Sequence, residues 1–411
     1  MPSALNFRRA LVALLVLASP AYAQDTASAP WTREVLKSVK LNEQRTLFVA
    51  TPDGYQGSTA RYPVLVLLDA NDRPQFTAAV ANVRFLASRN AIPPLIVLGI
   101  ANGKDRTHDM TPPATGPTAK SFPTAGGVGA LTDFIVDEAI PMIRSKYRTL
   151  PTTILAGHSF GGLYALHVAA TKPGIFAGII AMSPSLWWND TTVAVTYADA
   201  IAKATVTPRL FATSGGLEAS IDRSTRRFVS RLDSIKPASL AFAFRHYPDD
   251  THGLTPAPSL VDGLRFVFEP VTLTKLPINQ LRPGVDSATV VNAVIETEQT
   301  YARGAKSLGL PEHLPEPVLN SLGYTVLQGL KMPNVAIWMF RRNATYYPES
   351  ANVYDSLGDA LLAKGDTSAA KAEFRRVGEV AVRGGKPMPD ETRQKLDALE
   401  HATQAGKPKP Q

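Results

Sequence analysis

The sequence predicts an α/β fold, in which a mostly parallel sheet carries helices on both faces, followed by a smaller all-helical region. Short apolar runs alternate with amphipathic stretches from about residue 46 onward, as expected for repeated strand–helix units. Several runs are almost continuously apolar, which is typical of strands covered on both faces. Beyond about residue 272 these runs stop and only helical spacing remains.

The expected strands are the short apolar segments of the first two thirds of the chain. They lie at residues 46–50, 63–69, 95–101, 152–156, 176–183, 208–214 and 240–247. Apolar residues at helical spacing predict helices between them, at 129–147, 160–171 and 222–235. Pro141 lies inside the first of these helices and is expected to kink it, because proline has no amide hydrogen to donate.

The first 23 residues resemble a secretory leader rather than part of the fold. Arg8 and Arg9 precede the apolar run "ALVALLVLA", and the small residues "AYA" predict cleavage after Ala23. Neither this run nor any other is long enough to predict a transmembrane helix. The sequence therefore predicts an exported protein, periplasmic or secreted, without a membrane span.

Composition excludes several classes of site. The chain has no cysteine, which excludes disulfides, thiolate metal sites and a cysteine nucleophile. Its formal net charge is +8, but no basic stripe with interleaved aromatic residues predicts nucleic-acid binding. The sequence contains no H-E-x-x-H motif that would predict a metal site, and no cofactor is expected. The expected partner is a small molecule.

The segment "AGHSFGG", residues 156–162, carries the main functional signal. It follows one apolar run directly and precedes a helical stretch. A nucleophilic serine must be exposed beside backbone N–H groups, and a sharp strand-to-helix turn achieves this. Such a turn leaves little room for side chains two positions away, which explains Gly157 and Gly161. Ser159 is therefore the predicted nucleophile.

The other site residues are expected where loops follow the strands. The Phe160 N–H and the Asn71 N–H are the predicted oxyanion donors. Glu218, in "RLFATSGGLEAS", and His252, in "FRHYPDDTHGLTP", follow in the order acid then histidine that this turn predicts. His252 is the expected base. For the carboxylate that orients His252, the alternatives to Glu218 are Asp222, Asp249 and Asp250, or a Ser–His pair without an acid.

The helical region contains an internal repeat. Leu322 and Leu357 are 35 residues apart, while two further pairs, Ala336 with Ala370 and Phe340 with Phe374, are 34 apart. This period, with Pro348 closing the first unit, resembles tetratricopeptide repeats. A plain helical hairpin is the alternative. Because only two units are visible, we expect the region to lean on the preceding domain, on a second copy or on a protein partner.

These observations divide the chain into five parts. We expect a signal peptide at 1–23, a catalytic α/β domain at 31–272, a linker at 273–314, a tetratricopeptide-like domain at 315–400 and a disordered tail at 401–411.

Residues 36–270 resemble the esterase-D-like "putative esterase" group of α/β-hydrolases, especially its bacterial branch of siderophore trilactone esterases. The resemblance runs through "RYPVLVLLDAND", "DRTHDMTP", "LAGHSFGGLYALH", "MSPSLWWND", "SGGLE" and "DDTHGLTPAPSLVDGLRFVF". It implies an α/β-hydrolase fold, with Ser159 and His252 as the catalytic pair, Glu218 on the carboxylate-bearing loop and Asn71 and Phe160 at the oxyanion positions. The chain departs from the group at Ala70, where many relatives have glycine, and in its helical extension.

The resemblance implies a serine esterase acting on small or siderophore-type esters through an acyl-enzyme. Trp187 and Trp188 either line an aromatic pocket or plug the sheet edge. Arg106 either binds an anionic substrate or forms an ion pair with Asp109. Two other functions remain open: an acyltransferase that uses the same site, and a helical-repeat adaptor whose hydrolase half is inactive.

Overall fold

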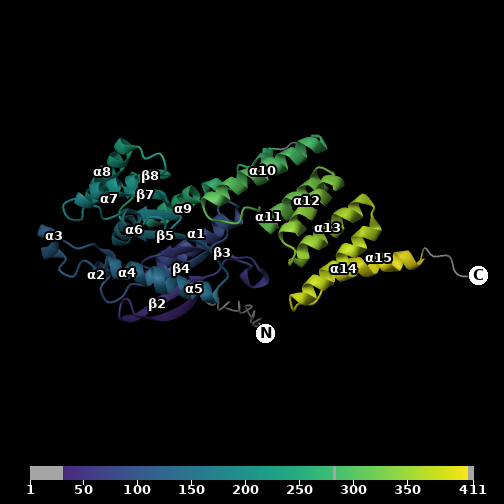
Figure 1. Ribbon diagram of the computed structural model, residues 1–411, viewed down its shortest axis with the longest axis horizontal. Coiled ribbons are helices and arrows are strands. Elements are labelled where there is room, and N and C mark those ends of the chain that lie inside the picture. Colours follow the sequence, from purple (N-terminus) through teal and green to yellow (C-terminus); the bar gives the residue numbers. More distant parts are fainter. Residues whose placement is uncertain (1–30, 281–283, 406–411) are drawn as a thin grey trace, which may run out of the picture.

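The computed structural model describes residues 31–280 and 284–405. The predicted leader at 1–23 lies outside these residues. The molecule is elongated, with a sheet half (residues 31–272) at one end and a helical half (residues 273–405) at the other (Figure 1).

An eight-stranded sheet forms the centre of the sheet half. Its order is β1-β2-β4-β3-β5-β6-β7-β8; β1 and β2 run antiparallel to their neighbours, and the strands from β4 to β8 are parallel. The strands are β1 (Thr32–Ser38), β2 (Glu43–Ala50), β3 (Tyr62–Leu67), β4 (Ile96–Ile100), β5 (Thr149–His158), β6 (Gly178–Met182), β7 (Arg209–Gly215) and β8 (Phe242–Tyr247). The predicted α/β fold is confirmed, and every predicted apolar run contains a strand.

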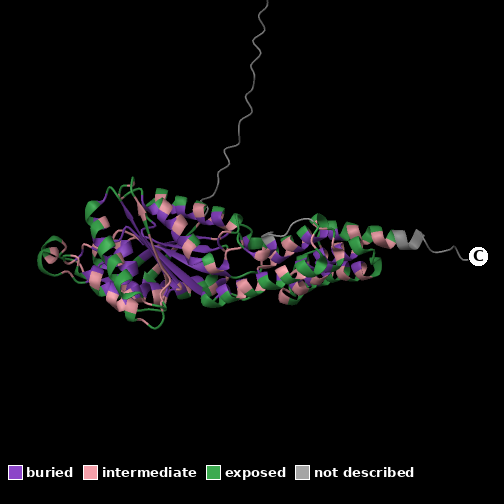
Figure 2. Ribbon diagram, turned by 90° about the horizontal axis from the view of Figure 1, so that it is seen from above, coloured by how far each residue is buried: buried purple, intermediate pink, exposed green. Residues whose placement is uncertain are grey.

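Helices cover both faces of the sheet, whose strands are buried between them (Figure 2). Along β3, Leu65 and Leu67 enter one core with α1 (Arg73–Ser88) and α9 (Pro256–Val267). Val64 and Val66 enter a second core on the opposite face. That core includes α6 (Phe160–Thr171), α7 (Thr192–Lys203) and α8 (Ala219–Ile235). This alternation explains why the strands read as continuous apolar runs.

Pro141 is accommodated by a wide helical turn. The predicted helix at 129–147 consists of α4 (Val128–Phe134), a π-helical turn (Ile135–Ala139) and α5 (Ile140–Lys146). Pro141 lies in the first turn of α5, where a missing amide hydrogen is tolerated. The π turn marks where the regular hydrogen-bond ladder is interrupted.

The helical half contains two helix pairs that are packed through the same contact. Its elements are α10 (Ser287–Ser307), α11 (Glu316–Tyr324), a π-helical turn (Thr325–Gly329), α12 (Pro333–Tyr346), α13 (Ala351–Lys364), α14 (Thr367–Arg383) and α15 (Asp390–Ala405). A Cβ added to Gly323 would lie 2.5 Å from the Phe340 ring, and one added to Gly358 would lie 2.4 Å from the Phe374 ring. Glycine therefore lets each aromatic ring reach the partner helix.

The uneven period of the repeat arises in the connection between the paired helices. Gly323 and Ala336 are one residue further apart than Gly358 and Ala370. The helical segment ends at the same distance from the glycine in both pairs, at Gly329 and at Lys364, but the connection that follows is 330–332 in the first pair and only 365–366 in the second. Assignment of these pairs to tetratricopeptide repeats stays a prediction.

The prediction of a linker at 273–314 is wrong, because α10 fills half of it and packs against the sheet half. Val290, Val294 and Tyr301 of α10 are buried in the same core as α1 and α9 of the sheet half. The Thr152 hydroxyl, in the first half of β5, lies 2.8 Å from the carbonyl oxygen of Gly309. The helical half and the sheet half thus share one hydrophobic core.

The predicted tail at 401–411 is wrong for its first residues, since α15 continues to Ala405. Across the described residues, no helix combines the length and apolarity that a bilayer crossing requires.

Candidate active site

Ser159 lies in a strained turn between β5 and α6. Its backbone has φ 60° and ψ −115°, a combination that a residue with a side chain adopts only when its surroundings enforce it. The Ser159 N–H donates to the Met182 carbonyl over 3.0 Å, and its own carbonyl accepts from the Ser185 N–H over 3.1 Å. The end of β6 therefore holds the serine at the tip of the turn.

The two glycines of the turn are required to different degrees. A Cβ on Gly157 would lie 2.3 Å from the backbone carbonyl oxygen of Gly161, a distance that no rearrangement of a side chain could relieve. A Cβ on Gly161 would be 3.3 Å from the nearest atom, in the Asp69 carboxylate. The first glycine of the motif is thus the stricter requirement.

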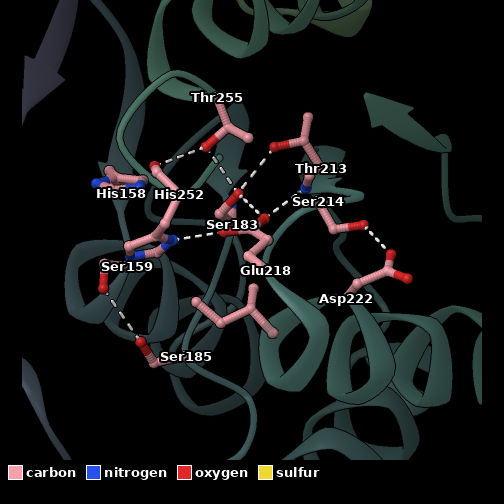
Figure 3. Close-up of polar contacts among 12 residues, drawn as sticks. His158, Ser159, Ser183, Ser185, Thr213, Ser214, Glu218, Asp222, His252 and Thr255 are labelled. Carbon is pink, nitrogen blue, oxygen red and sulfur yellow. Dashed lines mark hydrogen bonds and ion pairs between the residues drawn. The ribbon is translucent and has the colours of Figure 1, made fainter. Parts of the chain in front are cut away.

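Glu218 and His252 form a hydrogen-bonded pair beside the turn (Figure 3). His252 Nδ1 lies 2.5 Å from Glu218 Oε2, and the Glu218 side chain is only 4% exposed. When Nδ1 donates to the carboxylate, the neutral ring presents Nε2 as an acceptor. Burial alone would raise the pKa of Glu218, but hydrogen bonds from His252, the Gly215 N–H and Ser183 hold it below its usual range.

Buried hydroxyl groups support this pair. The Ser183 hydroxyl donates to Glu218 Oε1 over 2.5 Å and lies 2.8 Å from the Thr255 hydroxyl, which is 3.1 Å from the His252 carbonyl oxygen. The Thr213 hydroxyl accepts from the Ser183 N–H. These residues were absent from the sequence prediction. The only available signal was their place at the carboxyl ends of strands, where loops converge.

The other candidate acids have different partners. Asp222 contacts Ser214, Arg226 and His246. Asp249 is exposed, and the Asp250 backbone carbonyl accepts from the Leu217 N–H. Of the four carboxylates considered, Glu218 contacts the His252 ring through the hydrogen bond described above.

The His252 ring lies against the turn that carries Ser159. Its centroid is 4.3 Å from that of His158, the residue before the serine. The Ser159 hydroxyl is 3.3 Å from the Ser185 hydroxyl, and in the part of the chain that the structure describes it makes no hydrogen bond to His252. Such bonds often form only when substrate is bound. The fold nevertheless brings three distant segments together at this point.

At the positions where the oxyanion donors are expected, two backbone N–H groups have no hydrogen-bond partner among the described residues. After β3, the Ala70 N–H donates to Ile100 and the Asp72 N–H to Asp69. The intervening Asn71 N–H has no partner among the described residues. The same is true of the Phe160 N–H, at the first position of α6. In this loop the positive φ, 59°, belongs to Asp69, so alanine at position 70 introduces no backbone strain.

The three candidate substrate-binding residues, Arg106, Trp187 and Trp188, have different environments. Arg106 pairs with Asp69, whereas Asp109 pairs with Arg45, so the proposed Arg106–Asp109 pair is wrong. Trp188 is fully buried and presents no surface to a ligand, so its assignment to a pocket wall is wrong in this conformation. Trp187 is half-buried, and its ring centroid is 6.0 Å from that of Phe160.

A cavity of about 210 Å³ opens between α1 and α9, beside the carboxyl ends of β3 and β6. Asp72 and Gly253, which follow Asn71 and His252 in the chain, contribute to its wall. Leu67, Met182 and Leu260 form apolar parts of the lining. Its volume is below the range of about 300–1,000 Å³ that is usual for drug-sized ligands, which suits a small group.

His158 should make the protein less stable in mild acid. Burial, followed by the charge of a protonated His252, lowers the pKa of His158 from 6.5 to about 4. Between these values the unfolded chain binds a proton that the folded protein does not, so stability is full above pH 6.5 and falls as pH drops towards 4. We expect wild type to lose about 2 kcal/mol more than His158→Gln between pH 7 and pH 5. Urea unfolding at both pH values measures this, and equal losses would contradict it.

Comparison with known proteins agrees with this geometry. Residues 38–217 match the family model described as "Putative esterase". The ferri-bacillibactin esterase BesA of Bacillus subtilis (strain 168) is 28% identical over 263 residues, covering 58% of this chain and 90% of that protein.

Two solved structures extend the comparison. An IroE-like serine hydrolase from Shewanella oneidensis is 27% identical, with a TM-score of 0.63, and the match covers 73% of this chain and 95% of that one. An uncharacterised protein from Capnocytophaga ochracea DSM 7271 matches 90% of this chain and 99% of its own, with a TM-score of 0.57 at 17% identity. That last likeness is one of fold alone, and its extent includes most of the helical half.

Proposed function

We propose that this chain hydrolyses carboxylic esters with Ser159 as nucleophile, because residues 38–217 match the family model described as "Putative esterase". The observation that carries the proposal is the hydrogen bond between His252 and the buried Glu218, beside the strained turn at Ser159. A carboxylate that accepts from one ring nitrogen leaves the other nitrogen available to take the serine proton.

The reaction follows from these positions. Ser159 Oγ attacks the ester carbonyl carbon while His252 Nε2 accepts the hydroxyl proton. The N–H groups of Asn71 and Phe160 donate to the resulting oxyanion. Collapse of the tetrahedral intermediate breaks the bond to the alcohol, which receives the proton from His252 and leaves an acyl-enzyme. Water then attacks the acyl carbon while His252 Nε2 accepts its proton. The bond to Ser159 Oγ breaks, the carboxylic acid leaves, and His252 returns the proton to Ser159.

We propose small or siderophore-type esters as substrates and export to the periplasm or exterior as the setting. The BesA relative, which covers most of its own length in the match, is named for a ferri-siderophore substrate. Phe160 and the half-buried Trp187 provide an aromatic surface next to Ser159. The modest cavity between α1 and α9 suits a short acyl or alcohol group better than a long lipid chain.

A fluorophosphonate probe tests the nucleophile directly. It should form a covalent adduct with wild-type protein, and peptide mass spectrometry should locate the adduct on Ser159. Prior unfolding in urea should abolish labelling, because the activating geometry exists only in the fold. Absence of an adduct on the folded protein would overturn the proposal.

A panel of nitrophenyl esters of increasing acyl length, together with a ferric catecholate trilactone, then tests the substrate class. We expect activity on the trilactone or on short acyl chains, declining with chain length. Preference for long chains would contradict the substrate class. Added alcohols or sugars distinguish hydrolysis from transfer, because an acyltransferase would accumulate the new ester in place of the free acid.

A further inference from the structure

One arginine connects the two parts of the chain that carry the proposed oxyanion donors. Arg106 opens α2 (Arg106–Met110), a short helix after β4. Its Nε and Nη2 donate to the two carboxylate oxygens of Asp69 over 2.5 and 2.8 Å. Nη2 also donates to the carbonyl oxygen of His158 over 3.2 Å. The same guanidinium lies 5.4 Å from the centre of the Phe160 ring.

Asp69 is fully occupied by these contacts. Asn102 Nδ2 donates to the same oxygen as Arg106 Nε, over 2.8 Å, and the Asp69 backbone carbonyl accepts from the Asp72 N–H. The backbone of Asp69 has a φ of 59°, an uncommon conformation that surrounding contacts must maintain. These bonds bracket Asn71, so the direction of its free N–H depends on them.

The helix that carries Arg106 is fixed from the opposite side. Asp105 caps it by accepting from the His108 N–H over 2.9 Å. Asp109, next to the last residue of α2, is buried and pairs with Arg45 of β2. Arg45 also contacts the Ala101 carbonyl at the end of β4. Arg106 is therefore presented by an anchored element, which distinguishes it from a mobile surface arginine.

We propose that Arg106 is a positioning residue for ester hydrolysis. It holds the loop that carries the Asn71 N–H against the turn that carries Ser159 and the Phe160 N–H. Both N–H groups can then donate to the same oxyanion. This inference rests on the proposed function. It stands against the hypothesis that Arg106 binds an anionic substrate, since its Nε and Nη2 already donate to Asp69 and His158, and kinetics decide between the two roles.

The two roles predict different kinetics. An oxyanion exists only in the transition state, so loss of alignment lowers kcat and leaves KM nearly unchanged for every ester. Loss of a contact to substrate charge raises KM, and only for anionic esters. Removal of a single oxyanion donor typically lowers kcat by about 10²–10³-fold, which sets the upper range for Arg106→Ala.

The experiment measures kcat and KM for Arg106→Ala, Arg106→Lys and Asp69→Asn on a neutral ester and on its carboxylate-bearing analogue. We expect Arg106→Ala to lower kcat by about 10–10³-fold on both esters, with KM within about threefold of wild type. Asp69→Asn should have a similar effect, and the double variant should be no worse than the poorer single one, because both changes break one contact. Arg106→Lys keeps the charge without the paired geometry and should recover kcat only in part.

Arg231→Ala is the matched control, since Arg231 forms an exposed ion pair with Asp199 on the outer helices α7 and α8. It should leave kcat unchanged. If Arg106→Ala does not fold, the decision falls to Arg106→Lys: a kcat equal to wild type overturns the proposal. A rise in KM confined to the anionic ester also overturns it. If wild type is not labelled by fluorophosphonate, the proposed function itself fails, whereas a labelled enzyme with normal Arg106 variants refutes only this inference.

Discussion

Replacing Ser159 by alanine is expected to lower kcat for ester hydrolysis by about 10⁵–10⁶-fold, with no loss of folding stability. The change removes the attacking oxygen, and in comparable triads loss of the nucleophile removes nearly all of the catalysis that the triad supplies. The Ser159 hydroxyl contributes a single 3.3 Å contact to Ser185, so the free energy of unfolding should change by less than about 1 kcal/mol. Steady-state kinetics and urea unfolding measure the two effects.

The same measurement on His252→Ala and on the double variant tests whether the residues act as one unit. Each single change and the combination should give similar residual rates, because the base has no role without the nucleophile. Glu218→Gln should lower kcat by a smaller factor, about 10⁴-fold, because it disturbs the tautomer of the His252 ring but leaves the nucleophile in place. Ser185→Ala serves as the hydroxyl-removal control and should stay within tenfold of wild type. A Ser159→Ala variant with more than a hundredth of the wild-type kcat would refute the assignment.

The sequence was sufficient to predict the strands that are buried on both faces, because such burial requires a continuous run of apolar residues. It was insufficient to predict β1, an edge strand whose exposed positions are Thr32, Arg33, Val35 and Lys37. An edge strand needs no apolar pattern on its outer side. The missed helix α10 has a different explanation. Its buried face is at helical spacing but includes Thr297 and Gly304 as well as Val290 and Val294, and it follows a proline-containing connector that resembles a linker.

Within the site, the glycine spacing identifies the turn from local sterics alone. Glu218 and His252 follow because strand ends converge at one edge of a parallel sheet. The hydroxyl network of Ser183 and Thr255 cannot be read in this way. It depends on side chains that meet across 72 positions in the chain, and serine and threonine are common enough to carry no local signal. The Arg106–Asp69 pair was missed because Asp109, three positions away, was the simpler partner in the sequence.

Replacing Gly157 by alanine is expected to be the most damaging single methyl addition in the turn. The new Cβ would lie 2.3 Å from the Gly161 carbonyl oxygen and 2.5 Å from the carbonyl carbon. Because both atoms belong to the backbone at the start of α6, relief requires the helix to move away from β5. Overpacking of a rigid site typically costs about 1–3 kcal/mol, and we expect Gly157→Ala to reach or exceed about 3 kcal/mol.

Gly129→Ala provides the control, because Gly129 lies in α4, is exposed and has nothing within 4 Å of an added Cβ. There alanine should raise the free energy of unfolding by about 0.5–1 kcal/mol, since it restricts the unfolded chain and favours the helix. Urea unfolding compares the two variants, and ester hydrolysis reports on the turn. Since the clash displaces Ser159 and the Phe160 N–H together, Gly157→Ala should lose activity even where it remains folded. A folded, fully active Gly157→Ala would mean that the turn adopts a wider geometry than the one described, and the account of how the serine is exposed would fail with it.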